Sequence, residues 1–372
     1  MPPLATDDLP IDLAGAELGP ALAAFFKDQD VASPQMAFRV DRGPDYFGIC
    51  RLQGHDHRVL VARRGAEILG TMTVLFDRVH HRGRPIEVAY TADLRVAPAA
   101  RGGGLADRLM REAVRVIRDH AGPDAAIVTA VAPDNPAGLK KNANLAEVGV
   151  AMRPVGRLRT YFLAPFTPLG AARPFQPYRI RPATEADLPA MAALWAATNA
   201  RRDLARAFTP EAFAAWVRSA PNLGVEAFRL AVGPDDRPRA FLGVWSPRAV
   251  RRFELASETL AVTAARLTWN AVRPIAGLPA FPAPGESLPF HAVTNLCVPE
   301  PDAEALPWLL DEAFRVVRRD GSLFLGLALD ERDPLNRQAR RFIASASELL
   351  LLGNEPFHAP SDGPFHVELA LG

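Results

Sequence analysis

Apolar and polar side chains alternate along residues 86–96 with the period of two that a half-buried strand shows. The apolar positions are Ile86, Val88, Tyr90, Ala92, Leu94 and Val96. Further along, Leu105 to His120 follows the period of an amphipathic helix, and Gly122-Pro123 ends it. The pattern therefore predicts a strand that leads through Gly102-Gly103-Gly104 into a helix.

Further strands are expected on both sides of this unit. Arg58 to Arg63 and Glu67 to Val79 predict a hairpin that turns near Arg64-Gly65. Downstream, Ala125 to Val131 is typical of one more strand, and Arg157 to Leu163 of a terminal one. The first half of the chain thus combines several strands with a long helix.

A similar order of elements recurs about two hundred positions later, as internal repeats do. The helical segment Ala113-Val114-Arg115-Val116-Ile117-Arg118 is echoed by Ala313-Phe314-Arg315-Val316-Val317-Arg318. The second of these is followed by an apolar strand, Leu323 to Leu329, and the strands before the two helices end at Pro98 and Pro299. This ordered set of matches indicates an internal duplication.

The length of the chain also favours two cores. It has 372 residues, whereas single hydrophobic cores rarely grow beyond about 250 residues. The proline-rich stretch Pro165 to Pro177 predicts the boundary, and a helix from about Glu185 to Asn199 follows it. Gly277 to Pro289, rich in proline and glycine, predicts a surface loop in the second copy.

Three segments are therefore expected. Residues 1–35 form an N-terminal extension with a helix from about Leu13 to Lys27. Residues 36–170 form the first domain, and residues 171–372 form the second.

Composition excludes several functional classes. Apolar residues make up 49% and charged residues 23% of the chain, which is typical of globular proteins. The net charge of +1 provides no general attraction to nucleic acid. No apolar run reaches the roughly 18 residues of a membrane span, and the N-terminus lacks the cationic start of an export signal. The only cysteines, Cys50 and Cys297, are too far apart in sequence to suggest a disulfide framework. We therefore expect a cytoplasmic protein that binds neither membrane nor nucleic acid.

The glycine run has the chemistry of an anion-binding loop. Glycine lets the backbone approach an anion closely, and the first N–H groups of the following helix point toward it. Arg101 adds a cation beside them. A dinucleotide fingerprint would need a third glycine where Asp107 stands, and the chain has no Gly-Lys-Ser/Thr of a nucleotide P-loop. The loop therefore predicts a different phosphorylated cofactor.

Arg101-x-x-Gly104-x-Ala106 matches the signature of the GNAT superfamily of acetyl-CoA-dependent acyltransferases, and Leu94-x-Val96-x-Pro98 is typical of the strand before it. The chain resembles this family well over residues 36–165 and in outline over residues 178–372. The resemblance implies an α/β (α+β) fold with two tandem GNAT-like domains. Each would contain a mixed, mostly antiparallel sheet flanked by helices.

The resemblance also implies a cofactor site that needs no metal. Leu94 to Val96 would pair with the pantetheine arm of acetyl-CoA or another acyl-CoA, and the N–H of Val96 would stabilise the developing oxyanion. Arg101 would lie near the pyrophosphate, which would be held by the backbone of Gly102, Gly103, Gly104, Leu105 and Ala106. The implied reaction moves an acetyl group to an amine of a small molecule or peptide by direct attack. The alternative is a non-catalytic acyl-CoA sensor.

A proton acceptor is needed because an amine is protonated at neutral pH. Glu87, Tyr90 and Asp93 are the candidates on the strand that enters the site. Tyr90 falls on the apolar face, so it is expected in the core unless a β-bulge re-aims it.

Asn135 precedes Pro136, which is typical of a helix cap, and a contact with the cofactor is compatible with capping. Family members often carry a tyrosine seven residues after this asparagine, to protonate the departing thiolate. Here that position is Asn142. An amide cannot supply the proton, which leaves water, a side chain such as Tyr161, or no general acid.

The second copy lacks the glycine loop. Asp302, Ala303 and Glu304 stand in place of the three glycines, and Pro301 in place of Arg101. Two carboxylates would repel a pyrophosphate. The second copy is therefore expected to bind no CoA, and instead to cover the open sheet edge of the first copy and complete the acceptor pocket.

Overall fold

The computed structural model describes residues 8–32, 35–168, 178–359, 361 and 363–369. The strands of the first half are β1 (Ile11–Leu13), β2 (Asp30–Ala32), β3 (Met36–Asp41), β4 (Asp56–Arg64), β5 (Glu67–His81), β6 (Arg84–Val96), β7 (Ala126–Val131) and β8 (Arg153–Leu163). Its helices are α1 (Gly19–Lys27), α2 (Cys50–Gln53), α3 (Leu105–Ala121) and α4 (Pro136–Asn144). The predicted hairpin is confirmed as β4 and β5, and the predicted long helix as α3. The other strands predicted for this half are confirmed as β6, β7 and β8.

The predicted start of the first helix is wrong. Ile11–Leu13 forms strand β1, which pairs with β4, and the α-helix begins only at Gly19-Pro20. Proline is favoured in the first turn of a helix because its missing N–H would have no partner there. The described residues before position 36 thus contribute two strands, β1 and β2, and the helix α1 to the first half. The three domain limits remain a prediction.

The strands of the second half are β9 (Arg179–Pro182), β10 (Phe228–Val232), β11 (Pro238–Trp245), β12 (Arg252–Glu258), β13 (Phe290–Cys297), β14 (Phe324–Asp330) and β15 (Ala344–Gly353). Its helices are α5 (Leu188–Asn199), α6 (Pro210–Ser219), α7 (Leu260–Ala276), α8 (Ala305–Arg319) and α9 (Asn336–Ala339). Residues 277–289 contain neither helix nor strand, as predicted. Residues 169–177 of the predicted boundary lie outside the described residues.

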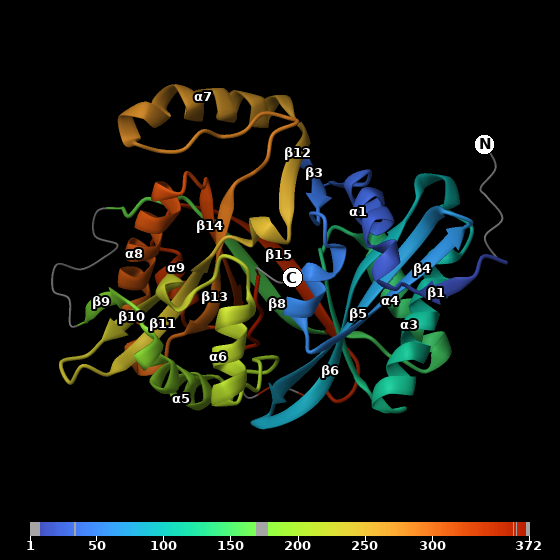
Figure 1. The fold of residues 1–372 in the computed structure, drawn as a ribbon, viewed down its shortest axis with the longest axis horizontal. Helices are drawn as coiled ribbons and strands as arrows, with labels where there is room; N and C mark the ends of the chain where they lie inside the picture. The colour runs from blue at the N-terminus through green and yellow to red at the C-terminus, as the bar shows by residue number, and fades with distance from the viewer. Residues whose placement is uncertain (1–7, 33–34, 169–177, 360, 362, 370–372) are drawn as a thin grey trace.

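One sheet of twelve strands connects both halves of the molecule (Figure 1). Its order is β1-β4-β5-β6-β7-β15-β8-β14-β13-β11-β10-β9, and a small second sheet has the order β12-β3-β2. Within the described residues, only β6–β7 and β13–β14 pair in parallel. The fold class is confirmed as mixed α/β with a mostly antiparallel sheet.

The two halves exchange their last strands at the centre of this sheet. Strand β7 of the first half pairs with β15 of the second half, while β14 of the second half pairs with β8 of the first. The two exchanged strands also pair with each other, and they cross the middle of Figure 1 in green and red. The second half therefore covers a sheet edge of the first with its own strand, and the halves share one continuous sheet.

Helix α3 packs its predicted apolar face on the first half of this sheet, with Leu105, Leu109, Ala113 and Ile117 all buried. Its first two turns lie close to β5, because a Cβ atom at Gly70 would lie 3.1 Å from Leu105 Cδ2 and 2.9 Å from Leu109 Cδ1. This close approach brings the glycine run to the end of strand β6. Among the described residues, no helix combines the length and apolarity that crossing a bilayer would require.

Candidate functional site

The glycine loop has a backbone that few other residues adopt. Gly102 has φ of 84° and Gly104 has φ of 77°, both in the left-handed region. A Cβ atom at either position would meet nothing within 4 Å. Glycine is therefore favoured there by backbone conformation and not by lack of space. Gly104 is also the N-cap of α3.

Several amides of this loop point to no acceptor. Within the described part of the chain, the N–H groups of Gly102, Gly104, Leu105 and Ala106 have no hydrogen-bond partner. They lie at the positive end of the α3 dipole, which favours an anion. The exposed Arg101 folds back on the strand, where its Nε donates to the carbonyl of Val96 at 3.2 Å. The loop thus presents peptide hydrogens and a cation on one surface.

Strand β6 carries a bulge just before the loop. The pairing of β5 with β6 shifts between Thr71 and Thr73, and Asp93 has φ of 57°. The hydroxyl of Thr71 donates to the Asp93 carbonyl at 3.2 Å. This is a bulge of the kind considered for this strand, but it lies after Tyr90 and leaves the pairing of Tyr90 with Leu75 intact.

Beyond Tyr90, strands β6 and β7 separate. Their ladder covers residues 88–90 of β6, and the Thr129 hydroxyl of β7 donates to the Thr91 carbonyl at 2.8 Å just beyond it. The N–H of Ala97 donates to Leu69 O at 2.9 Å. Val96 and its partner Gly70 are therefore a non-hydrogen-bonded pair, and the Val96 N–H points away from β5 into the gap between β6 and β7. Leu94, two residues earlier, lies on the same side of the strand.

Asp93 is tied to a buried cation. Arg42 Nη2 donates to its two carboxylate oxygens at 2.7 and 2.6 Å, and the hydroxyl of Thr73 donates at 3.3 Å. The Arg42 side chain is only 3% exposed. This pair fixes the bulge and occupies both carboxylate oxygens of Asp93 with donors.

The structure does not bring Glu87 to this gap. Its side chain is 40% exposed and forms ion pairs with His55 at 3.5 Å and with His120 at 3.3 Å. His120 lies in the last turn of α3, whose 17 residues span about 25 Å from the glycine loop. Glu87 and the loop thus lie near opposite ends of the helix.

Tyr90 lines a cavity of about 110 Å³ between the two halves. The walls come from β5, β6, β7, β15, α5 and the C-terminal segment, defined here as residues 363–369. Burial raises the pKa of Tyr90 to about 12, so its phenol keeps its proton at neutral pH. The face of the strand that was predicted to lie in a core thus borders a partly open cavity.

Asn135 caps helix α4, as predicted, since its side-chain oxygen accepts from Gly138 N at 2.9 Å. Asn142 is buried on the same helix, and its Nδ2 donates to Gly138 O at 3.0 Å. Its Oδ1 has no donor among the described residues. The hydroxyl of Tyr161 donates to Asn336 at 2.7 Å and is buried away from the gap.

The corresponding loop of the second half is closed by its own contacts. The N–H groups of Asp302 and Ala303 donate to Pro299 O and Glu300 O at 2.9 and 3.2 Å. The hydroxyl of Tyr178 donates to Asp302 at 2.9 Å, and Gln338 donates to Glu304 at 3.1 Å. This loop therefore offers side chains and satisfied amides where the first half offers glycines.

Sequence reasoning missed the C-terminal part of the cavity wall. His366 and Glu368 line the cavity together with Trp195 of α5, although they lie far from β6 in the sequence. The sheet glycines Gly156 and Gly326 make room for this segment: a Cβ atom at either would lie 2.6 Å from Phe365 Cδ2 or Leu369 Cδ2, respectively. Glycines in the strands β8 and β14 are the one local signal of such a close approach.

Residues 25–140 match the model of the acetyltransferase (GNAT) family. This segment includes the bulged strand, the glycine loop and Asn135, and the match supports acyl-CoA-dependent N-acyl transfer in general. No curated protein matches the chain significantly by sequence.

Solved structures share the fold over nearly the whole chain. N-myristoyltransferase from Saccharomyces cerevisiae with bound myristoyl-CoA is 12% identical with a TM-score of 0.60, and the match covers 95% of this chain and 86% of that one. A GCN5-related N-acetyltransferase from Sphaerobacter thermophilus is 16% identical with a TM-score of 0.55, covering 98% of both chains.

A tandem GNAT protein from the clavulanic acid biosynthesis pathway is 14% identical with a TM-score of 0.56, covering 95% of this chain and 100% of that one. At such identities the likeness shows the fold alone. The chain therefore has the fold of tandem GNAT proteins, and its residues 25–140 match the GNAT family model.

Proposed function

We propose that the first half binds an acyl-CoA, most simply acetyl-CoA, and transfers the acyl group to an amine of a small molecule or peptide. One observation carries the proposal: the opened strand edge at Val96 leads directly to the unpartnered amides of the glycine loop. An extended arm fits the strand edge, and a diphosphate fits the amides.

The residues present fit such a ligand. Gly102 and Gly104 leave space at the loop, and Arg101 is the exposed cation beside it. Asn142 of helix α4 contributes a buried acceptor, its Oδ1. An ion pair between Lys141 of the same helix and Asp107 connects α4 to the first turn of α3. An amide N–H of the pantetheine arm is the donor that Asn142 Oδ1 would accept from.

The chemistry then rests on alignment. An amine held against the thioester carbonyl attacks the carbon, and pre-alignment supplies several kcal/mol of the barrier. The N–H of Val96 points into the gap and is the proposed donor to the oxyanion that develops. The C–N bond forms, the C–S bond breaks, and CoA leaves as the thiolate.

The acceptor is proposed to enter the cavity between the halves. Its lining is mainly apolar, with Leu75, Val128 and Trp195 among the walls, and Tyr90 marks the point where β6 and β7 separate. An amine carried on a small apolar group suits this lining. Free, buried Cys50 and Cys297 suit the reducing cytoplasm proposed as its location.

Calorimetric titration with acetyl-CoA tests the proposal. Binding in the micromolar range, about −8 kcal/mol, is expected for the wild type. Gly104→Glu places a strained side chain and a negative charge in the loop and should abolish binding. Gly122→Glu is the matched control, because Gly122 also has positive φ and open space but lies at the other end of α3. Absence of wild-type binding at millimolar acetyl-CoA would contradict the proposal.

A non-catalytic acyl-CoA sensor is the second candidate, and Asn142 favours it, because this residue cannot protonate a thiolate. Release of CoA thiol from acetyl-CoA, measured with a panel of primary amines, separates the two functions. Steady release that depends on the amine identifies a transferase. Repeating the assay with octanoyl- and myristoyl-CoA determines the preferred acyl length.

A further inference from the structure

The cavity between the halves contains a histidine–carboxylate pair that the second half supplies. His366 Nε2 lies 2.9 Å from Glu368 Oε1, and both side chains are about nine-tenths buried, at 9% and 11% exposure. Both residues line the cavity that Tyr90 also lines. A titratable pair is thus buried beside the point where strands β6 and β7 separate.

Glu368 is held in place by the second half. Its carboxylate accepts from the backbone N–H of Asn295 at 2.9 and 3.0 Å and from the hydroxyl of Thr294 at 2.9 Å. Its remaining contact is with the imidazole of His366. The carboxylate is therefore saturated by hydrogen bonds, which fixes its orientation and that of the ring it contacts.

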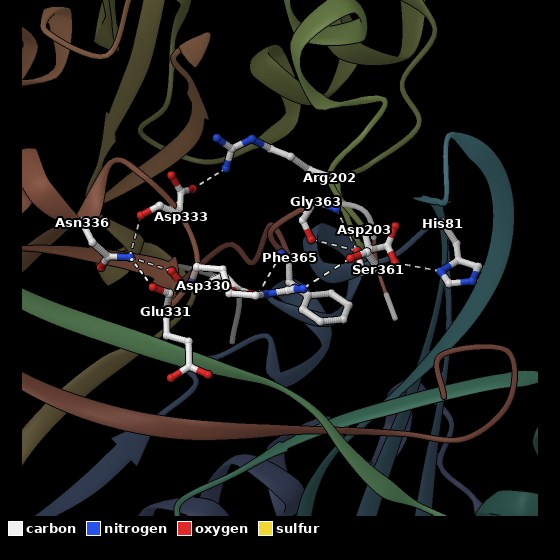
Figure 2. Close-up of polar contacts among 11 residues, drawn as sticks. His81, Arg202, Asp203, Asp330, Glu331, Asp333, Asn336, Ser361, Gly363 and Phe365 are labelled. Atoms are coloured by element: carbon white, nitrogen blue, oxygen red, sulfur yellow. Dashed lines mark hydrogen bonds and ion pairs between the residues drawn. The ribbon is translucent and has the colours of Figure 1, made fainter. Parts of the chain in front are cut away.

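His366 is positioned by two further elements. Its ring packs edge-on against Trp195, with the ring centres 5.1 Å apart, and its backbone N–H donates to Asp203 O at 2.8 Å. The neighbouring Phe365 N–H donates to the buried carboxylate of Asp330 at 3.0 Å. Figure 2 shows this anchoring of the chain around Asp203 and Asp330, with His81 on the far side of Asp203.

We propose that His366, positioned by Glu368, is the group that takes the proton from the acceptor amine. This inference rests on the proposed function and names a catalytic residue for it. Neutral imidazole accepts a proton readily near neutral pH, and a carboxylate on its other nitrogen stabilises the imidazolium that results.

The other charged or titratable groups of the described cavity wall are less suited. Asp77 forms an ion pair with Arg206 at 2.6 Å, and burial keeps Tyr90 protonated by raising its pKa to about 12. Glu368 itself accepts three donors. His366 contacts Glu368 through Nε2, and its other ring nitrogen, Nδ1, is the atom proposed to take the proton.

One proton moves from the ammonium of the acceptor to His366, and the nitrogen lone pair then forms the C–N bond with the thioester carbon. The C–S bond breaks, and its electron pair leaves on the CoA sulfur. The nitrogen loses its second proton as the amide forms, and this proton neutralises the thiolate; His366 returns its proton to solvent.

The test uses the full chain, acetyl-CoA and an amine that the wild type acetylates. His366→Gln should lower kcat about 100-fold, as expected for loss of a general base, and should remove the decline of kcat/KM at acid pH. Acetyl-CoA affinity should stay within twofold. Glu368→Gln should also lower kcat while acetyl-CoA affinity is kept, because the imidazole loses the carboxylate that orients it.

His358→Gln is the matched control. His358 also faces a glutamate, Glu355, at 3.1 Å, but it does not line the cavity. Its substitution should leave both kcat and the pH profile unchanged. His366→Ala with added imidazole gives an independent readout, since restored turnover requires a proton acceptor and not a structural contact.

An active wild type whose His366→Gln variant keeps kcat within threefold and the same acid decline would overturn this inference alone. The same holds if imidazole restores nothing to a His366→Ala variant that still binds acetyl-CoA. A wild type without acetyl-CoA binding would overturn the proposed function, and this inference with it.

Discussion

The two halves of the molecule share a backbone plan but differ in what their loops present. Each has a bulged strand that separates from a parallel neighbour, with positive φ at Asp93 in one half and at Asn295 in the other, 57° and 46°. In the first half the strand leads to glycines with unpartnered amides. In the second it leads to acidic side chains and amides that are already bonded.

The two bulges also differ in the groups that their residues contact. Asp93 is held by the cation of Arg42, whereas the N–H of Asn295 is occupied by the carboxylate of Glu368. The second bulge therefore binds a segment of its own chain where the first is proposed to bind a thioester. A repeated fold thus does not by itself repeat a site, because side chains decide which backbone groups stay available.

Removing the cation at the first bulge should have the largest effect on stability. Arg42→Met leaves the mostly buried carboxylate of Asp93 without its partner and should cost about 3 kcal/mol in the free energy of unfolding, measured in urea. Arg39→Met, three residues earlier on β3, is the control: its pairs with Asp30 and Glu254 are partly exposed, so the loss should stay below about 1 kcal/mol. Equal losses for the two variants would contradict the role of Arg42.

Displacing the C-terminal segment tests whether the second half supports the cavity. Gly326→Leu forces a side chain into the space of Leu369 and should cost about 1–3 kcal/mol through overpacking. Turnover should fall while acetyl-CoA affinity is kept, because the glycine loop is untouched. A variant with unchanged kcat would show that the segment has no part in the reaction.

The cap at Asn135 distinguishes a structural role from a cofactor contact. Asn135→Ala should lower stability by about 1 kcal/mol in thermal or urea unfolding, as loss of a helix cap does. Thr209→Ala removes an equivalent cap from α6 in the second half and should cost a similar amount. A weakening of acetyl-CoA binding by more than about tenfold, or 1.4 kcal/mol, in the Asn135 variant alone would identify a cofactor contact instead.

The smallest effect is expected from making the second loop resemble the first. The double variant Asp302→Gly and Glu304→Gly should create no second acetyl-CoA site, since the N–H groups at positions 302 and 303 donate within their own turn. Equilibrium dialysis would measure this. A second molecule bound per chain would mean that the acidic side chains alone close this loop.

The glycine loop could be predicted from the sequence because its signals are local. Alternation up to Val96, the three glycines and the helix that follows lie within one short stretch, and the structure reproduces their order. The bulge was harder to place, because the apolar positions continue to alternate through Leu94 and Val96 while the backbone turns at Asp93.

The cavity could not be predicted, because its walls come from distant parts of the chain. Tyr90, Trp195 and His366 meet only after the two halves exchange strands β8 and β15, and no local pattern marks that exchange. Similarly, the first helix was predicted to start too early because Leu13 fits a helical period, although residues 11–13 pair with β4.

The number of acetyl-CoA molecules bound per chain tests the central comparison most directly. Calorimetric titration of the wild type should give one site per chain, and Gly104→Glu should leave none. Two sites in the wild type, or one site that survives in Gly104→Glu, would contradict the assignment of cofactor binding to the glycine loop of the first half.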